Sequence, residues 1–471
     1  MLMLFLCAFI MEEDLMPSMR ISALGSDFTQ LIEDPFTDVQ FNPAELGTFD
    51  GLTIYFKPEW VTSGTGGKLN TAIFNPRLSR NVGFGLMGSY SYAKTYNISN
   101  YSMNGYFAAD TLSSTQVLPS GNLFITFPFL VDGGFFGLKM MINKPYLNSS
   151  VRHYSSSADT NYYNSDTTLY QYHSWYYDGS IDKTFLWSIR GGQYLPLGNS
   201  ALDFTFAVIH SQPYENNYDS SFSENFSQQI YHYDSSRTLN ISRNISESYA
   251  TDEKNYDIWN EKMGFGWTRY FDQGSIKFIL QGSIGNGEIN EQEIIQNRSF
   301  YEYRYEYTSP DTSYIQVDTL TNDYTTSSTS IISSILSDNE ETGIGLEKRI
   351  ENSINFLTGF RLRRGRMEIE RTTPDSVKTV DTYYKVIMPI ASEFFLTPTF
   401  CLRGGISLTY TDSTSETIST QEAKITSQNF KVYRSFGLGL KIRNKFRIDL
   451  FTSGSNLASL DNWKFEGIFS F

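Results

Sequence analysis

The chain has 471 residues, of which 16% are aromatic, a formal net charge of −14 and only two cysteines. Its mean hydropathy is −0.33, and after residue 11 no apolar run is long enough for a membrane-spanning helix. An acidic chain without a basic stripe is not a nucleic-acid-binding protein, and two cysteines cannot form a disulfide framework. Many aromatic residues in a chain that is hydrophilic on average instead suit strands that alternate between two environments.

Residues 1–14 read as a signal peptide or the remnant of a leader. The apolar run from Met1 to Met11 has signal-peptide length and is followed by Glu12, Glu13 and Asp14. It lacks a basic start and a small-residue cleavage site. We therefore favour a true start upstream of Met1, with a cytoplasmic protein as the alternative.

Residues 15–48 show no strand-like alternation. Phe28, Leu31 and Ile32 stand at helical spacing, and Pro35 and the Asn42-Pro43-Ala44 stretch follow. This pattern predicts a short helix with turns, which we expect to precede the wall of the fold as a separate N-terminal hatch.

From residue 49 to residue 471 apolar and polar residues alternate with period two. Short turn signals fall at residues 78–81, 132–134, 197–200, 272–274, 349–352, 396–398 and 443–445. Longer polar connections fall between them, at residues 63–67, 97–116, 155–167, 212–251, 296–338, 373–377, 412–424 and 453–460. This alternation of short and long connections predicts an all-β fold, a transmembrane antiparallel β-barrel of about 14–16 strands with an N-terminal plug. A soluble β-sandwich, the alternative, would leave many aromatic residues exposed.

The last strand ends on Phe469 and Phe471, on the same side of an extended chain. A terminal aromatic at this spacing resembles the assembly signal of bacterial outer-membrane barrels, although Gly467 stands one position late. The resemblance implies a place in the bacterial outer membrane, with outer-membrane lipid and the barrel assembly machinery as partners. We expect a monomer.

Basic residues outnumber acidic ones at positions expected to face the lumen. The candidate lumen charges are Lys139, Arg190, Arg361, Arg363, Arg403, Lys441 and Arg443. They either pair with acidic residues and with the N-terminal segment, or attract an anionic solute. In the wall, Gly83, Gly85 and Gly88 continue a strand and not a strand-to-helix turn, so they do not form a nucleotide-binding motif. Because glycine weakens a strand, they are the candidate for a lateral exit.

Four histidines, His153, His173, His210 and His232, lack the spacing of metal ligands, so we predict neither a metal site nor a cofactor. His210 with nearby Asp219 is the least implausible starting point for a catalytic site. A hydrolase is therefore kept only as a distant alternative, and the chain is predicted not to be an enzyme.

Residues 20–46 resemble the N-terminal hatch of the FadL-type outer-membrane transporters, which carry long-chain fatty acids and aromatic hydrocarbons. The matching residues are Leu24, Gly25, Phe28, Asn42, Pro43 and Ala44, together with Ala23, Asp34 and Leu46. Ser26, Asp27 and Glu45 depart from the small residues usual there. The resemblance implies a plugged barrel whose lumen passes a hydrophobic solute. A structural or secretion-system partner barrel is the alternative function.

Overall fold

The computed structural model describes residues 18–471 except residues 61–64, 80–81, 104–105, 129–132, 164–165, 234–235, 310, 351–352, 373–376, 419–422, 443–444 and 454–462. The predicted leader therefore lies outside the described residues. The helices are α2 (Met19–Leu24), η1 (Ser26–Phe28), α3 (Pro35–Phe41) and η2 (Pro43–Thr48). The strands are β1 (Thr53–Trp60), β2 (Thr65–Ser79), β3 (Val82–Met103), β4 (Tyr106–Pro128), β5 (Phe135–Asn143), β6 (Tyr146–Tyr163), β7 (Asp166–Leu197), β8 (Ser200–Tyr233), β9 (Ser236–Phe271), β10 (Gly274–Thr308), β11 (Ser313–Ile350), β12 (Ile354–Arg371), β13 (Val377–Thr397), β14 (Phe400–Ile418), β15 (Ala423–Ile442), β16 (Phe446–Ser453) and β17 (Lys464–Ser470). Among the described residues, no helix is both long and apolar enough to cross a membrane.

The strands form one closed antiparallel sheet. The ring closes where β1 pairs with both β2 and β17, with Ile54 opposite Phe469, and where the backbone N–H of Phe471 donates to the Leu52 carbonyl at 2.9 Å. Strands β5 and β6 both pair with β4 and β7 in one continuous register, so they share one position. In the described residues seventeen strands thus fill sixteen positions, which confirms the predicted barrel at its larger strand count. Strands β1 and β2 belong to this wall and not to the plug.

The segment before β1 folds inside the barrel as the plug, which we define as residues 18–48. The Ser18 hydroxyl caps α2, and the Asp34 carboxylate caps α3, whose first residue is Pro35. Apolar plug residues pack against the wall in two clusters, one around Phe36 and Tyr55 and one around Phe28 and Leu357. The predicted plug-bearing architecture is therefore confirmed.

The outer face of the wall carries an apolar belt, whereas the inner face contacts the plug. On β8, exposed Phe204 and Phe206 alternate with buried Asp203 and Ala207. Other exposed apolar side chains continue the belt around the ring, including Leu86, Met140, Met263, Leu280, Phe360, Ile390 and Ile406. This is the arrangement that a lipid-facing wall requires.

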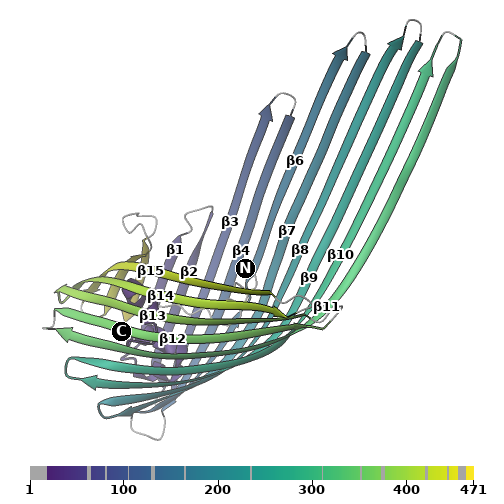
Figure 1. Cartoon of the computed structure of the whole chain (residues 1–471). Coiled ribbons are helices and arrows are strands. Elements are labelled where there is room, and N and C mark those ends of the chain that lie inside the picture. Colours follow the sequence, from purple (N-terminus) through teal and green to yellow (C-terminus); the bar gives the residue numbers. More distant parts are fainter. Residues whose placement is uncertain are drawn as a thin grey trace.

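The expectation of long polar loops at residues 97–116, 155–167, 212–251 and 296–338 is wrong. The described residues of these segments extend β3, β4 and β6–β11, so that β11 has 38 residues, and Figure 1 shows them as a tall sheet rising from one end of the barrel. At about 3.3 Å per residue, β11 far exceeds the 9–11 residues that cross a bilayer. Serine, threonine and tyrosine indicated loops, yet here they pair across strands, as in the 2.8 Å contact between the Ser113 and Ser150 hydroxyls and the parallel rings of Trp175 and Phe222.

Candidate functional site

Glycines of the wall let the plug backbone approach the inner face. The Leu24 carbonyl lies where a Cβ on Gly405 would be, and the Leu31 carbonyl does the same at Gly345. On the far side, the Asn42 side chain occupies the Cβ position of Gly192. A side chain at Gly345 or Gly405 would have to displace the plug backbone, and one at Gly192 would have to displace the Asn42 side chain.

The predicted hatch residues all lie at this interface or within the plug. Leu24, Phe28 and Ala44 are fully buried, and Gly25 ends α2 with φ +110°, a conformation that side chains rarely adopt. Asn42 begins η2 by accepting from the Ala44 N–H at 3.1 Å, and its amide donates to the Asp203 carboxylate at 2.8 Å. Pro43 sits against Gly137 of β5.

Replacing Gly405 with valine is expected to unseat the plug. The new side chain would overlap the Leu24 carbonyl, and overpacking of this kind costs about 1–3 kcal/mol. The readout is labelling of Cys401, which is buried on the same face of β14, by a small water-soluble maleimide in a Cys7→Ser background. Labelling should be faster in Gly405→Val than in Gly404→Val, where the nearest atom to the new Cβ is 3.9 Å away. Equal rates in the two variants would contradict the close approach.

A buried ion-pair network fixes α2 to β13 and β14. Arg20 donates to Glu393 at 2.9 and 3.1 Å, and Arg403 donates to the same carboxylate at 2.8 Å. Arg403 also pairs with Asp449 on β16, at 2.5 Å. Glu393 thus holds one arginine of the plug and one of the wall.

Three more of the predicted lumen charges bind the plug backbone. Lys139 donates to the Gln40 carbonyl at 3.3 Å, Arg190 to the Phe41 carbonyl at 3.1 Å, and Arg361 to the Thr29 carbonyl. These three residues therefore contact the N-terminal segment. Arg363 pairs with Glu341 at 2.8 Å, Lys441 is exposed near the end of β15, and Arg443 lies outside the described residues.

Burial raises the pKa of the Asp38 carboxyl to about 6, although the Lys277 ammonium 3.4 Å away opposes the effect. The docked plug therefore favours protonated Asp38. The stabilisation of the folded protein that comes from protonated Asp38 is fully present below the ordinary pKa near 4 and is lost as the pH rises through about 6. The difference from the ordinary value is worth about 3 kcal/mol.

Thermal unfolding of the detergent-solubilised protein at pH 4.5 and pH 7.5 tests this sign. We expect the midpoint of the wild type to fall more between these pH values than that of Asp38→Asn, which cannot take up the proton. Parallel falls in the two proteins would show that Asp38 does not titrate on docking.

The three glycines of the candidate lateral exit differ in how regularly their part of the strand is paired. Gly85 and Gly88 are paired with both β2 and β4, and a Cβ on Gly85 would meet the Phe74 ring in the lumen. Gly83 lies beside the irregular register between Asn75 and Ser79 of β2. Its role in solute exit stays a prediction.

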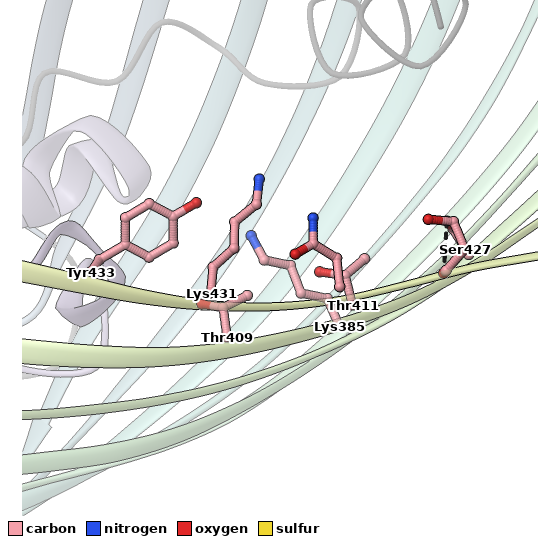
Figure 2. A pocket seen from close by; sticks show the side chains of 8 residues that line it. Lys385, Thr409, Thr411, Ser427, Lys431 and Tyr433 are labelled. Carbon is pink, nitrogen blue, oxygen red and sulfur yellow. Dashed lines mark hydrogen bonds between the residues drawn. The ribbon is translucent and has the colours of Figure 1, made fainter. Parts of the chain in front are cut away.

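The inner wall next to the plug contains a polar recess with a cavity volume of about 200 Å³. It is lined by Lys385, Thr409, Thr411, Ser413, Ser427, Asn429, Lys431 and Tyr433 on β13, β14 and β15. Ser407, two residues before Thr409 on β14, donates to Asp27 of the plug. Figure 2 shows the ammonium groups of Lys385 and Lys431 pointing away from the strands into the lumen. We call this site the lysine recess.

Apolar side chains cluster on the same inner face further from the plug. We call this the inner apolar patch, formed by Tyr256, Ile258, Ile289, Ile335, Met367 and Ile369. In the register of the sheet, Arg363 of β12 lies opposite Lys385 of β13. Met367 follows four residues after Arg363 on β12. At about 3.3 Å per residue the patch therefore begins roughly 13 Å from the level of Lys385. Neither the patch nor the two lysines was predicted from the sequence.

The geometry around His210 differs from the catalytic starting point considered above. His210 bonds to Asp257 at 2.6 Å and stacks on Trp259, with Trp187 beside it. His210 lies on the outer face, whereas Asp219 lies nine residues further along β8, opposite Asp178 of β7 in the register of the sheet. The structure does not bring His210 and Asp219 together.

Comparisons with known proteins find no matching family model and no matching curated protein. Among solved structures, the CymD monoaromatic hydrocarbon channel is 10% identical and aligns over 96% of this chain and 97% of its own, with a TM-score of 0.32. The P. putida toluene transporter TodX is also 10% identical, over 91% and 92%, with a TM-score of 0.32. The FrpB iron transporter from Neisseria meningitidis is 8% identical, over 93% and 83%, with a TM-score of 0.29. At these values the function has to be argued from the chain's own residues.

Proposed function

We propose that the protein carries small amphipathic acids, molecules with an apolar part and one acidic group, across the outer membrane of a bacterium. The observation that carries the proposal is the lysine recess beside the inner apolar patch, on the lumen side of a plugged barrel. Ammonium groups bind a carboxylate, and an apolar surface binds the chain attached to it.

The outer-membrane location is supported by the apolar belt on a closed antiparallel wall, since an open sheet edge is not tolerated in lipid. Phe469 and Phe471 lie in this belt with 38% and 69% of their surface exposed. Their role as an assembly signal, and the assembly machinery as a partner, belong to the same proposal.

The plug explains why such a barrel would select its solute. Sixteen strands enclose a lumen wide enough for water, and the plug packs against both halves of the inner wall through α2 and η2. A solute that enters from the extended end of the barrel then meets the lysine recess next to the plug. Ions and small hydrophilic molecules gain nothing from the apolar patch.

Uptake by cells tests the proposal. Cells that produce the protein should accumulate radiolabelled dodecanoate faster than cells that lack it, and should show a smaller advantage for uncharged dodecanol. Permeability to a small hydrophilic antibiotic should be the same in both strains. Equal dodecanoate uptake by the two strains would reject transport of amphipathic acids.

A further inference from the structure

The extended part of the sheet is open, although the barrel below it is closed. Strand β11 pairs with β12 only from Ser333 to Ile350, whereas it pairs with β10 along its whole length from Ser313. Within the described part of the chain, residues 313–331 therefore form a free edge, which we call the β11 edge. In Figure 1 it is the border of the tall sheet. At about 3.4 Å per residue its nineteen residues span roughly 65 Å.

The β11 edge lacks proline and lysine, two residues that keep exposed strand edges from pairing, although it carries two aspartates and one register shift between Thr319 and Thr321. Residues 313–331 contain no proline, lysine, arginine or glycine, and threonine, tyrosine, isoleucine and valine favour the extended conformation. The described side chains from Ser313 to Asp318 and from Asp323 to Ser328 are all exposed. Tyr314, Ile315 and Val317 are each more than half exposed.

Two backbone hydrogen bonds show which residues of β11 point their N–H and C=O groups to the free side. The Ile332 carbonyl accepts from Thr372, beyond β12, whereas the Arg349 N–H donates to Gln273, beside β10. N–H and C=O groups of one residue point to the same side of an antiparallel strand and alternate along it. Between residues 324 and 332, even-numbered residues such as Thr326 and Ser328 therefore present their backbone groups to the free side.

We propose that the β11 edge binds an extended, positively charged segment of another protein as an additional antiparallel strand. Main-chain hydrogen bonds would supply the affinity, as in other cases of strand addition. The charges on the edge are Asp318 and Asp323, both acidic, in a chain with a net charge of −14. A partner segment rich in lysine or arginine complements them.

A second copy of the chain is a poorer occupant. Copies in one membrane share their orientation, so two β11 edges would run parallel and place Asp318 and Asp323 against their own counterparts. Among the described residues, the other free border of the tall sheet is β3 beyond Lys94, the last residue of β3 that pairs with β2. It ends at Met103 and is too short to cover the β11 edge.

The test uses the full chain in detergent and a fluorescent peptide built from repeats of Lys-Thr-Val-Thr. Thr326→Pro/Ser328→Pro removes two outward N–H groups but no bond to β10, whereas Thr326→Ala/Ser328→Ala keeps them. Heat-modifiable migration in gels reports whether each variant is folded. We expect peptide affinity to fall at least about tenfold in the proline variant and to change less than about twofold in the alanine variant.

A second arm does not depend on how the variants fold. The same peptide with N-methyl groups on alternate residues should lose binding to the wild type, and a peptide with glutamate in place of lysine should bind more weakly. Equal binding of the methylated peptide, or of the proline variant, would overturn the proposal. A wild-type dimer that the proline variant abolishes, without peptide binding, would assign the edge to a second copy instead.

Discussion

Deleting residues 19–48 is expected to turn a barrel that conducts ions poorly into one with large, steady openings in planar lipid bilayers. The plug lies inside the barrel, where it packs in two apolar clusters and contacts both halves of the wall, whereas an empty barrel of sixteen strands leaves an aqueous channel. Heat-modifiable migration should first show that the shortened chain is folded. Equally low conductance of the intact and shortened proteins would mean that the plug does not close the lumen.

Replacing Glu393 with glutamine is expected to lower the free energy of unfolding by about 3–5 kcal/mol, the usual effect of breaking a buried ion pair. The variant leaves Arg20 and Arg403 buried against a neutral amide, because both donate to this carboxylate. Urea unfolding followed by tryptophan fluorescence measures the change.

Glu340→Gln is the matched control for Glu393→Gln. Glu340 faces Arg364 at 3.8 Å, with 72% of its side chain exposed, and exposed pairs contribute about 0–1 kcal/mol. Cys401 should also react faster with a maleimide in Glu393→Gln if the plug has loosened. Similar losses of stability in the two variants would argue against a special role for the buried network.

The two faces of the wall could be predicted because side-chain alternation is a local property of the sequence. Phe204 and Phe206 on one face and Asp203 and Ala207 on the other reveal the two environments without any knowledge of partners. Part of the plug could be predicted for a similar reason, since Pro35 and the Asn42-Pro43-Ala44 stretch are local signals, and the structure begins α3 at Pro35 and caps η2 with Asn42.

The tall sheet could not be predicted, because its polar segments become strands by pairing with residues that are distant in the sequence. Residues such as Ser155 and Ser174, or Tyr177 and Tyr218, indicate loops when considered singly, but they meet across neighbouring strands. The wall glycines that admit the plug were missed for the same reason. Gly405 resembles any other strand glycine until Leu24 is found against it.

The lysine recess also depends on contacts between strands. Lys385 and Lys431 come from β13 and β15, with Thr409 and Thr411 of β14 between them. The signal available in the sequence was their place on the inward side of each strand's alternation. That signal does not show that the two lysines meet, because the register of β13, β14 and β15 depends on contacts between the strands.

Calorimetric binding of dodecanoate to the purified protein tests the proposed solute class most directly. Lys385→Met/Lys431→Met should weaken binding at least about tenfold, since a charge-assisted hydrogen bond is worth about 1.5–3 kcal/mol. The control Lys378→Met/Lys424→Met removes two lysines from the outward positions of β13 and β15 and should bind as the wild type does. Unchanged affinity in Lys385→Met/Lys431→Met, or an equal loss in both double variants, would contradict the assignment of the recess to the acidic group of the solute.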